Sequence, residues 1–274
     1  MRGGRWRGVI LHAGLIGGAV LTLAPLIWMT AVSLMHPGEA NTAKLNLWPE
    51  APTLENYRHL FTRLNMARHF LNSAVVSCAA TLLSVLVNSL AGYALAKLHF
   101  PGRDILFRRM TAAMVIPAQV GMLPLFLLLR QLGLVNTIGG VLVPYLASIF
   151  GIVLIRQYAL SIPDDLLDAA RMDGAGEFHI FRLVALPIMK PILVTMAAFT
   201  FLSAWNDFMW PLIVLSDEKL QTLPVALAKL AGEHVQDTEL MMAGSVITIL
   251  PPLIVFLLFQ KVYVEGIVAG SVKE

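Results

Sequence analysis

Charged residues are scarce in this sequence. Asp, Glu, Lys and Arg make up 14% of its 274 residues, whereas hydrophobic residues make up 57%. A soluble globular domain carries roughly 25% charged residues, so this balance excludes an ordinary soluble protein and indicates an integral membrane protein. The formal net charge of +3 is too small to indicate binding to nucleic acid.

Cysteine and the common catalytic motifs are also nearly absent. Cys78 is the one cysteine and lies in an apolar run, which excludes a disulfide framework and a thiolate metal site. The phosphate loop G-x-x-x-x-G-K-[ST] is missing, and the stretch HFPGRD at 99–104 lacks that pattern. There is no His/Glu metal cluster and no nucleophile elbow of a hydrolase. The chain is therefore predicted not to be an enzyme, and to bind no cofactor or metal itself.

The sequence consists instead of long apolar runs. A helix needs about 20 mostly apolar residues to cross the core of a bilayer. Hydropathy therefore predicts an all-α, polytopic membrane protein with no separate soluble domain. The first run is too long for the core of a signal peptide and is expected to stay as a transmembrane helix. The six predicted spans cover about 9–33, 69–96, 110–132, 137–159, 188–214 and 240–261.

Proline occurs inside several of these spans. In hydrocarbon, neighbouring helices must satisfy the backbone carbonyl that a proline leaves free. The pattern predicts bent, closely packed helices around a pathway, which is more than a simple anchor needs. The prolines concerned are Pro25, Pro117, Pro124, Pro251 and Pro252.

The distribution of Lys and Arg predicts the orientation. If the N-terminus lies inside, the inner segments carry more Lys and Arg than the outer segments, and the short loop at 97–109 is especially basic. Cytoplasmic loops are enriched in these residues, so both termini are predicted to be cytoplasmic. The loops at 34–68 and 216–239 then lie outside, and the segment 161–187 lies in the cytoplasm.

A charged stretch from Asp164 to Pro191 separates the fourth and fifth spans. Ionised groups are costly in hydrocarbon, so the stretch must lie in water. Pro163 suits the first turn of a helix, and the acidic residues after it suit the positive N-terminal end. Gly174 predicts a sharp turn, and 177–185 predicts a second short helix that Pro187 ends. The result is a helix–turn–helix with an apolar face to cover; an ordinary solvated loop is the alternative.

This stretch resembles a motif of permease subunits of ATP-binding-cassette importers. The motif reads E-A-A, three residues, G, nine residues, I-x-L-P. Here Asp168-Ala169-Ala170 precedes Gly174 by three residues, and Val184-Ala185-Leu186-Pro187 follows after nine. The resemblance implies that 161–187 is a coupling loop, and that its helical part at 164–187 docks into a cleft of an ATPase subunit. The residues it assigns to this contact are Asp168, Ala169, Ala170, Asp173, Gly174, Ala175, Phe178, Leu186 and Pro187.

The resemblance extends to the smaller permease of the maltose-type carbohydrate importers. It implies one permease domain over 1–274 with the importer-type permease fold, in the plasma (inner) membrane of a bacterium. It further implies that a sugar, a mono- or oligosaccharide, is moved inward while partner subunits hold ATP and Mg²⁺. The implied partners are a second, different permease, two ATP-binding subunits and an extracytoplasmic solute-binding protein. The matching stretches are TLENYRHLF (53–61), LPLFLLLRQLGLVNT (123–137), LSAWNDFMWPL (202–212) and FQKVYVEGIVAGSVKE (259–274).

Polar residues inside the spans are candidates for the translocation pathway or its gate. An ionisable group in a span usually faces the interior of the bundle or a cavity, so Asn206 and Asp207 are predicted to line this route, with Trp205 beside them. Asn88 and Gln119 are further candidates, for which hydrogen bonding between helices is the alternative.

The C-terminal tail resembles a tail that lies between the ATPase subunits in the same family. The residues that the resemblance assigns to this contact are Glu265, Gly266, Gly270 and Lys273. A frayed terminus is the alternative.

The sequence leaves the transported solute open. An importer of the same class for glycerol phosphate or a polyamine shares the coupling motif. An ion-coupled carrier is a further alternative, which predicts uptake without any ATPase partner and membrane ion pairs beyond Asp207.

Overall fold

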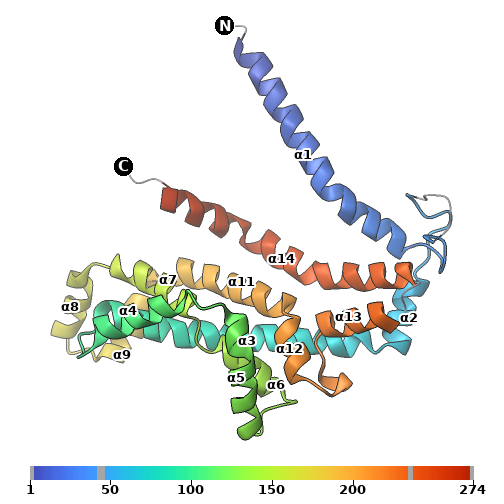
Figure 1. The fold of residues 1–274 in the computed structure, drawn as a ribbon. Coiled ribbons are helices and arrows are strands. Elements are labelled where there is room, and N and C mark those ends of the chain that lie inside the picture. Colours follow the sequence, from blue (N-terminus) through green and yellow to red (C-terminus); the bar gives the residue numbers. More distant parts are fainter. Residues whose placement is uncertain (1–2, 42–46, 234–236, 272–274) are drawn as a thin grey trace. The chain divides into compact units, whose positions relative to one another are not determined.

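The computed structural model describes the backbone of residues 3–41, 47–233 and 237–271. Side chains are described between Leu11 and Gln260, apart from Arg63, Glu233 and the two gaps. Every regular element in these ranges is a helix (Figure 1), which confirms the prediction of an all-α protein. The chain forms two compact units, Met1–Arg68 with Ala226–Pro251, and His69–Val225 with Pro252–Glu274.

The first unit is dominated by an exposed apolar helix. It contains α1 (Gly3–Ser33), α2 (Glu55–Arg63), most of α13 (Leu223–Glu233) and the first part of α14 (Thr238–Ser271). From Leu11 to Thr30 nearly every side chain of α1 is exposed within the chain, and burial begins at Ala31. An apolar helix of this length fits a surface covered by lipid or by another membrane subunit.

Polar groups close the end of α1. The buried Asn56 donates its Nδ2 hydrogens to the carbonyls of Ser33 (3.0 Å) and Met35 (2.8 Å). Ser33 is the last residue of α1, and the end of a helix leaves its carbonyl without a partner. In the loop that follows α1, the backbone N–H of Ala40 donates a hydrogen bond to the buried Glu239 of α14 at 2.7 Å.

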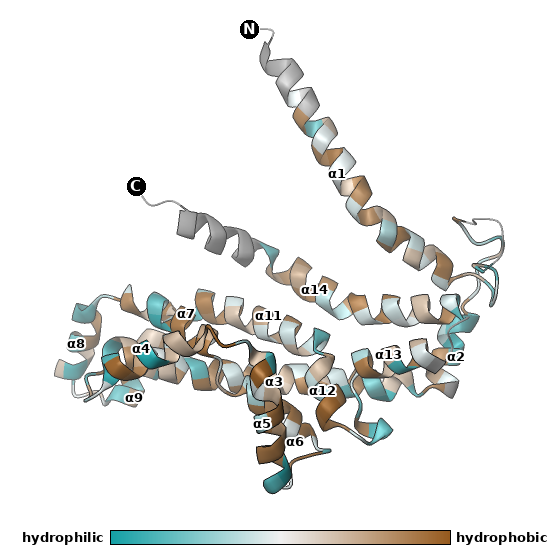
Figure 2. Ribbon diagram, viewed as in Figure 1, coloured by the Kyte–Doolittle hydropathy of each residue, from teal (hydrophilic) through white to brown (hydrophobic). Residues whose placement is uncertain are grey.

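The second unit holds the remaining helices. α7 and α11 run alongside α3 and pack against each other (Figure 1). Hydrophilic residues gather on α8, α9 and the start of α4, whereas α5 and α12 are largely hydrophobic (Figure 2). In chain order the elements are α3 (Met66–Lys97), α4 (Arg103–Ala113), α5 (Ala118–Gln131), α6 (Ile138–Leu142), η1 (Val143–Tyr145), α7 (Ile149–Leu160), α8 (Asp164–Met172), α9 (Glu177–Ile180), η2 (Phe181–Ala185), α10 (Leu186–Ile188), α11 (Lys190–Asn206), α12 (Met209–Val214) and η3 (Glu218–Leu220).

Two hydrophobic clusters stabilise the second unit at different ends of α3. The loop-end cluster joins Tyr93 and Ala96 of α3 to the segment 161–187 and to α7 and α11; its buried members are Tyr93, Ala96, Ile155, Ala159, Ile162, Leu167, Ile180, Phe181, Ala185, Met189, Leu193 and Met196. The opposite-end cluster joins Val76 of α3 to α5, α6 and α12; its buried members are Val76, Leu129, Val141, Trp210, Val214 and Leu215.

Three described helices are long and apolar enough to cross a membrane, and three bent helix pairs pass the same test when each pair is taken together. The long ones are Leu11–Ser33, Met66–Lys97 and Thr238–Gln260. The pair α4 and α5 bends by 107°, the pair α6–η1 and α7 by 44°, and the pair Glu177–Ile188 and α11 by 79°. The described residues therefore provide up to six spans if each bent pair counts as one.

The bend between α4 and α5 lies at Pro117, one of the prolines from which bent helices were predicted. A proline has no N–H to donate within a helix and disfavours the helical conformation of the residue before it, which accounts for a break at this position. Pro117 itself is extended, with φ −59° and ψ 133°. The prediction that Pro187 ends the second short helix is wrong, since α10 runs through Pro187 to Ile188. The π-helical turn η2 lies just before it, and such turns alter the local hydrogen-bond pattern of a helix.

Candidate functional site

The segment 161–187 folds as the predicted helix, turn and second helix. α8 begins after Pro163 and ends at a turn in which Gly174 has φ +80°. The N–H of Gly174 donates to Arg171 O and that of Ala175 to Ala170 O, both at 3.0 Å. An added Cβ at Gly174 would meet no atom within 4 Å, so the turn requires glycine for its left-handed backbone and not for space.

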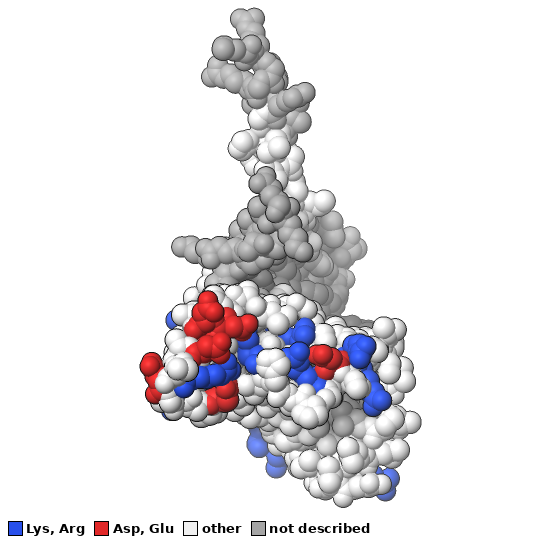
Figure 3. Space-filling view, turned by 90° about the vertical axis from the view of Figure 1, so that its left-hand side faces the viewer, with Lys and Arg blue, Asp and Glu red and all other residues white. Residues whose placement is uncertain are grey.

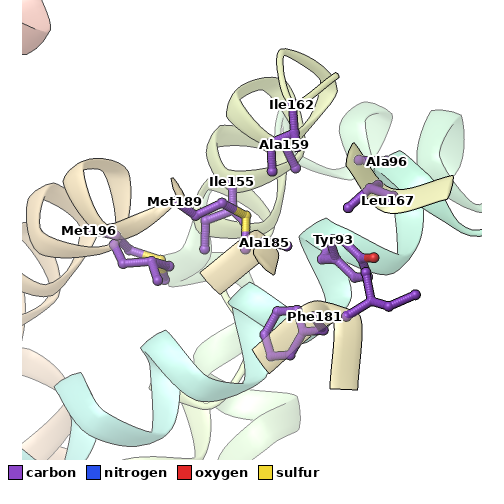
Figure 4. Packing of buried hydrophobic residues seen from close by; sticks show 12 residues of the cluster. Tyr93, Ala96, Ile155, Ala159, Ile162, Leu167, Phe181, Ala185, Met189 and Met196 are labelled. Atoms are coloured by element: carbon purple, nitrogen blue, oxygen red, sulfur yellow. The ribbon is translucent and has the colours of Figure 1, made fainter. Parts of the chain in front are cut away.

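One face of this segment is buried in the loop-end cluster. Leu167 of α8 is 1% exposed, and Ile180 and Phe181 continue the same buried face (Figure 4). The Phe181 ring lies 5.2 Å from the ring of Tyr93 on α3, centre to centre. A segment held by buried side chains on two of its helices is rigid, which is the property that transmission of a displacement requires.

Elsewhere the segment exposes large apolar side chains to solvent, of which Met172 and Phe178 are the most exposed. Met172 is 88% exposed and Phe178 is 68% exposed. Exposed apolar groups with polar residues around them are typical of a surface that binds another protein. Phe178 was assigned to such a contact from the sequence, whereas the apolar pattern of α8 alone gives no sign that Met172 points outward.

An ion-pair network spans the turn between α8 and α9. Arg171 donates from Nη1 to Asp168 Oδ1 (2.6 Å), from Nε to Glu177 Oε1 (2.8 Å) and from Nη2 to Glu177 Oε2 (3.3 Å). The hydrogen bonds to Glu177, and next those to Asp168, raise the pKa of Arg171 above its usual range. Asp168 thus has a partner on its own helix. The pairs are partly exposed, so each contributes about 1 kcal/mol at most.

The charged residues of this face are unevenly distributed. Figure 3 shows acidic side chains gathered over one part of the face and basic side chains beside them.

The predicted coupling residues differ in burial. Ala169 and Asp173 are exposed, while Ala170, Ala175 and Leu186 are partly buried and pack against the loop-end cluster. The nine predicted coupling residues therefore divide into those at the surface and those that support it from below.

The predicted pathway residues lie in different environments. Trp205 is 1% exposed and packs against Phe70 and Phe201, so within this chain it belongs to the packed interior. Its place on the pathway stays a prediction. Asn206 and Gln119 are exposed. Asn88 is buried and accepts a hydrogen bond from the N–H of Ser148 at 3.0 Å, which is the interhelical role given as its alternative.

Asp207 occupies the break between α11 and α12. Its Oδ2 accepts a hydrogen bond from the Tyr145 hydroxyl at 2.6 Å, and its Oδ1 accepts from the N–H of Trp210 at 3.4 Å. Tyr145 ends η1, so it lies at the bend between α6 and α7. The bond therefore joins the bend between α6 and α7 to the break between α11 and α12. Sequence reasoning missed Tyr145, and Pro144 beside it was the available signal of a break.

The sequence matches the model of a known protein family. The family described as binding-protein-dependent transport system inner membrane component matches residues 69–268. The chain belongs to this family. The match confirms the resemblance drawn from the motif, and it makes the chain a membrane-embedded transporter subunit of a bacterium, not an enzyme.

Individual members of the family are similar to this permease over most of their length. The arabinooligosaccharide transport system permease protein AraQ of Bacillus subtilis (strain 168) is 39% identical over 93% of this chain and 92% of its own length. The diacetylchitobiose uptake system permease protein NgcG of Streptomyces coelicolor is 33% identical over 97% of this chain and 87% of its own. A chain of the crystal structure of a bacterial transporter that imports the polysaccharide alginate has a TM-score of 0.84, at 27% identity, and covers 95% of this permease and 98% of that chain.

The tail of the permease lies outside what the structure describes in atomic detail. The helix α14 runs to Ser271, but the side chains beyond Gln260 are outside the described residues. The contact with the ATPase subunits expected for the tail thus stays a prediction for Glu265, Gly266, Gly270 and Lys273.

Proposed function

We propose that this permease subunit moves a mono- or oligosaccharide into the cytoplasm by alternating access. Two partner ATPase subunits hold ATP and Mg²⁺ and drive the cycle through the segment 161–187, while this chain binds no cofactor. A second, different permease completes the pathway. An extracytoplasmic solute-binding protein delivers the sugar to the loops at 34–68 and 216–239, and both termini are cytoplasmic.

The observation that carries this proposal is the construction of the segment 161–187. Its exposed surface presents Met172 and Phe178, which are largely open to solvent. Its other face is anchored through Leu167 and Phe181 to helices long enough to span a membrane. A partner that binds the exposed side chains can therefore displace the spans, because a close-packed interior transmits strain.

The sugar class is supported by the names of the relatives, which specify arabinooligosaccharides and diacetylchitobiose. Within this chain, the exposed Asn206 and the Asp207–Tyr145 pair are the groups we assign to the pathway or its outer gate. Amide, carboxylate and phenol groups supply the donors and acceptors that sugar hydroxyls need.

The experiment is transport into proteoliposomes that contain the complete transporter and its binding protein. The panel includes arabinooligosaccharides, diacetylchitobiose and lactose, together with sn-glycerol 3-phosphate and a polyamine. We expect uptake of a sugar that requires ATP and stops when the partner ATPase is inactivated. Uptake of glycerol phosphate or the polyamine alone would contradict the sugar class. Uptake that needs an ion gradient and no ATP would contradict the whole proposal.

A further inference from the structure

The helix α3 runs through the second unit without a break. The 29 residues from His69 to Lys97 span about 43 Å at 1.5 Å per residue. Other spans of the unit are interrupted at Met114–Pro117, at Leu146–Ser148 and at Asp207–Phe208. An unbroken helix is the stiffest connection available between the two ends of this unit.

At its loop end, α3 holds the start of α8 through a buried lysine. The Lys97 side chain is 4% exposed, and its Nζ donates to Ile162 O at 2.6 Å and to Asp164 Oδ1 at 2.7 Å. A buried ammonium group is tolerated when its hydrogens are paired. Pro163 lies between the two acceptors with a restricted φ of −60°. Lys97 therefore bonds to the residues on both sides of Pro163, in the connection between α7 and α8.

Further contacts connect this end of α3 to the neighbouring helices. Tyr93 packs its ring on Phe181, and Arg156 of α7 donates from Nε to Leu95 O at 3.2 Å. The Arg156 guanidinium also lies 3.9 Å from the centre of the Phe107 ring of α4. The last two turns of α3 thus contact the segment 161–187 and α7, and α7 in turn contacts α4.

At its opposite end, α3 holds the segment that leads into α13. Asn72 donates from Nδ2 to the carbonyls of Lys219 (2.9 Å) and Gln221 (3.0 Å). The ring of His69 contacts Gln221 O at 3.0 Å, and Ser73 Oγ accepts from the N–H of Leu223 at 2.7 Å. Both ends of one helix are therefore fixed by hydrogen bonds to segments that lie far away in the sequence.

We propose that Lys97 is a positioning residue for transport, which fixes the coupling helix α8 to α3 so that the two move as one body. This role rests on the proposed function, in which an ATPase displaces α8. With the clamp in place, α3 carries that displacement to the residues 219–223 at its other end. Without it, α8 is held to α3 by the apolar contacts of the loop-end cluster but not at the joint between α7 and α8. Part of the displacement of α8 then no longer reaches the pathway.

The test uses the complete transporter with its binding protein in proteoliposomes and measures ATP hydrolysis and uptake together. In Lys97→Met we expect uptake to fall by about tenfold or more, the scale of a typical coupling energy, while hydrolysis without binding protein stays near the wild-type rate. ATP consumed per solute therefore rises. Lys97→Arg should recover most of the uptake, and Asp164→Asn should lose less than Lys97→Met because the bond to Ile162 O remains.

The matched control is Lys190→Met, which removes the same charge from an exposed lysine at the start of α11. We expect its ratio of ATP to solute to equal that of the wild type. If Lys97→Met does not assemble, Asp164→Asn decides, because it keeps the shape of the side chain. A wild-type ratio in Asp164→Asn, together with one in Lys97→Met where that variant assembles, would overturn the proposal.

The proposed function and this role can fail separately. If the assembled wild type transports none of the sugars, the sugar assignment fails. The role of Lys97 is then read from the stimulation of ATP hydrolysis by the binding protein. Loss of that stimulation in Lys97→Met, but not in Lys190→Met, supports the clamp, and full stimulation in both variants refutes it.

Discussion

At the scale of single residues, the main result is that several charged groups at the ends and breaks of the spans have defined partners. Lys97 is a basic residue of the kind that hydropathy analysis counts only for orientation, yet its side chain is buried and bonded to Ile162 and Asp164. Asp168 stands where the motif has the longer Glu, and its Oδ1 still accepts a hydrogen bond from Arg171 at 2.6 Å. The shorter acid is compatible with the loop because its partner lies one turn away on the same helix.

Acid should weaken the clamp at Asp164. The hydrogen bond from Lys97 lowers the pKa of the Asp164 carboxyl. Because the folded-state pKa is lowered, the contribution to stability is present above the unfolded pKa of about 4 and is lost as the pH falls through the folded value. Thermal unfolding of the solubilised permease should therefore separate wild type from Asp164→Asn at neutral pH. The separation should shrink as the pH falls below about 4 and vanish below the folded pKa. A separation that persists there would contradict the assignment.

Removing the Tyr145 hydroxyl should leave one oxygen of Asp207 without its described donor. We expect Tyr145→Phe to lower the free energy of unfolding by about 1–3 kcal/mol and to reduce uptake. In the double variant with Asp207→Asn the two effects should not add, because both act on one bond. Additive losses in thermal stability would show that the pair does not act together.

At the scale of elements, the turn between α8 and α9 depends on one glycine. Gly174→Val places a β-branched residue at φ +80°, a conformation that L-residues rarely adopt. We expect uptake to be abolished while insertion into the membrane is retained. Gly176→Val is the matched control, since Gly176 has an ordinary φ of −74°. Normal uptake and normal ATPase association in Gly174→Val would remove the coupling role from this turn.

Element boundaries also show where sequence reasoning stops. The helix predicted from Asp164 was correct, since an acidic first turn after proline and a glycine turn are local signals. The breaks at Leu146–Ser148 and Asp207–Phe208 were not predicted. They depend on hydrogen bonds between distant residues, such as Ser148 with Asn88 and Asp207 with Tyr145, and a hydropathy window averages over such positions.

At the scale of the whole molecule, the exposed apolar side chains are the surfaces where other molecules must attach. We expect Met172→Ser to reduce co-purification of the ATPase subunits, with a loss of about 1–2 kcal/mol in binding free energy. Leu82→Ala is the control, since Leu82 is also exposed but lies in the middle of α3, which the proposed topology places inside the membrane. Equal loss in both variants would contradict a specific ATPase contact.

The orientation of the molecule is testable by itself. A reporter fused after residue 50 should lie outside the cytoplasm, because the N-terminus is predicted inside and one span precedes this position. A cytoplasmic reporter would contradict the topology and, with it, the cytoplasmic position of the segment 161–187.

The sequence by itself determined that this protein is an all-helical membrane permease with a coupling motif. Hydrocarbon forces each spanning backbone to satisfy its own hydrogen bonds, so composition and run length are sufficient for the class, and motif spacing locates the turn at Gly174. The tertiary structure alone decided the partners of the charged residues at the ends and breaks of the helices. Lys97 bonds to Asp164, and Asp207 bonds to Tyr145. These partners lie far apart in the chain, and packing, which no local pattern encodes, brings them within bonding distance.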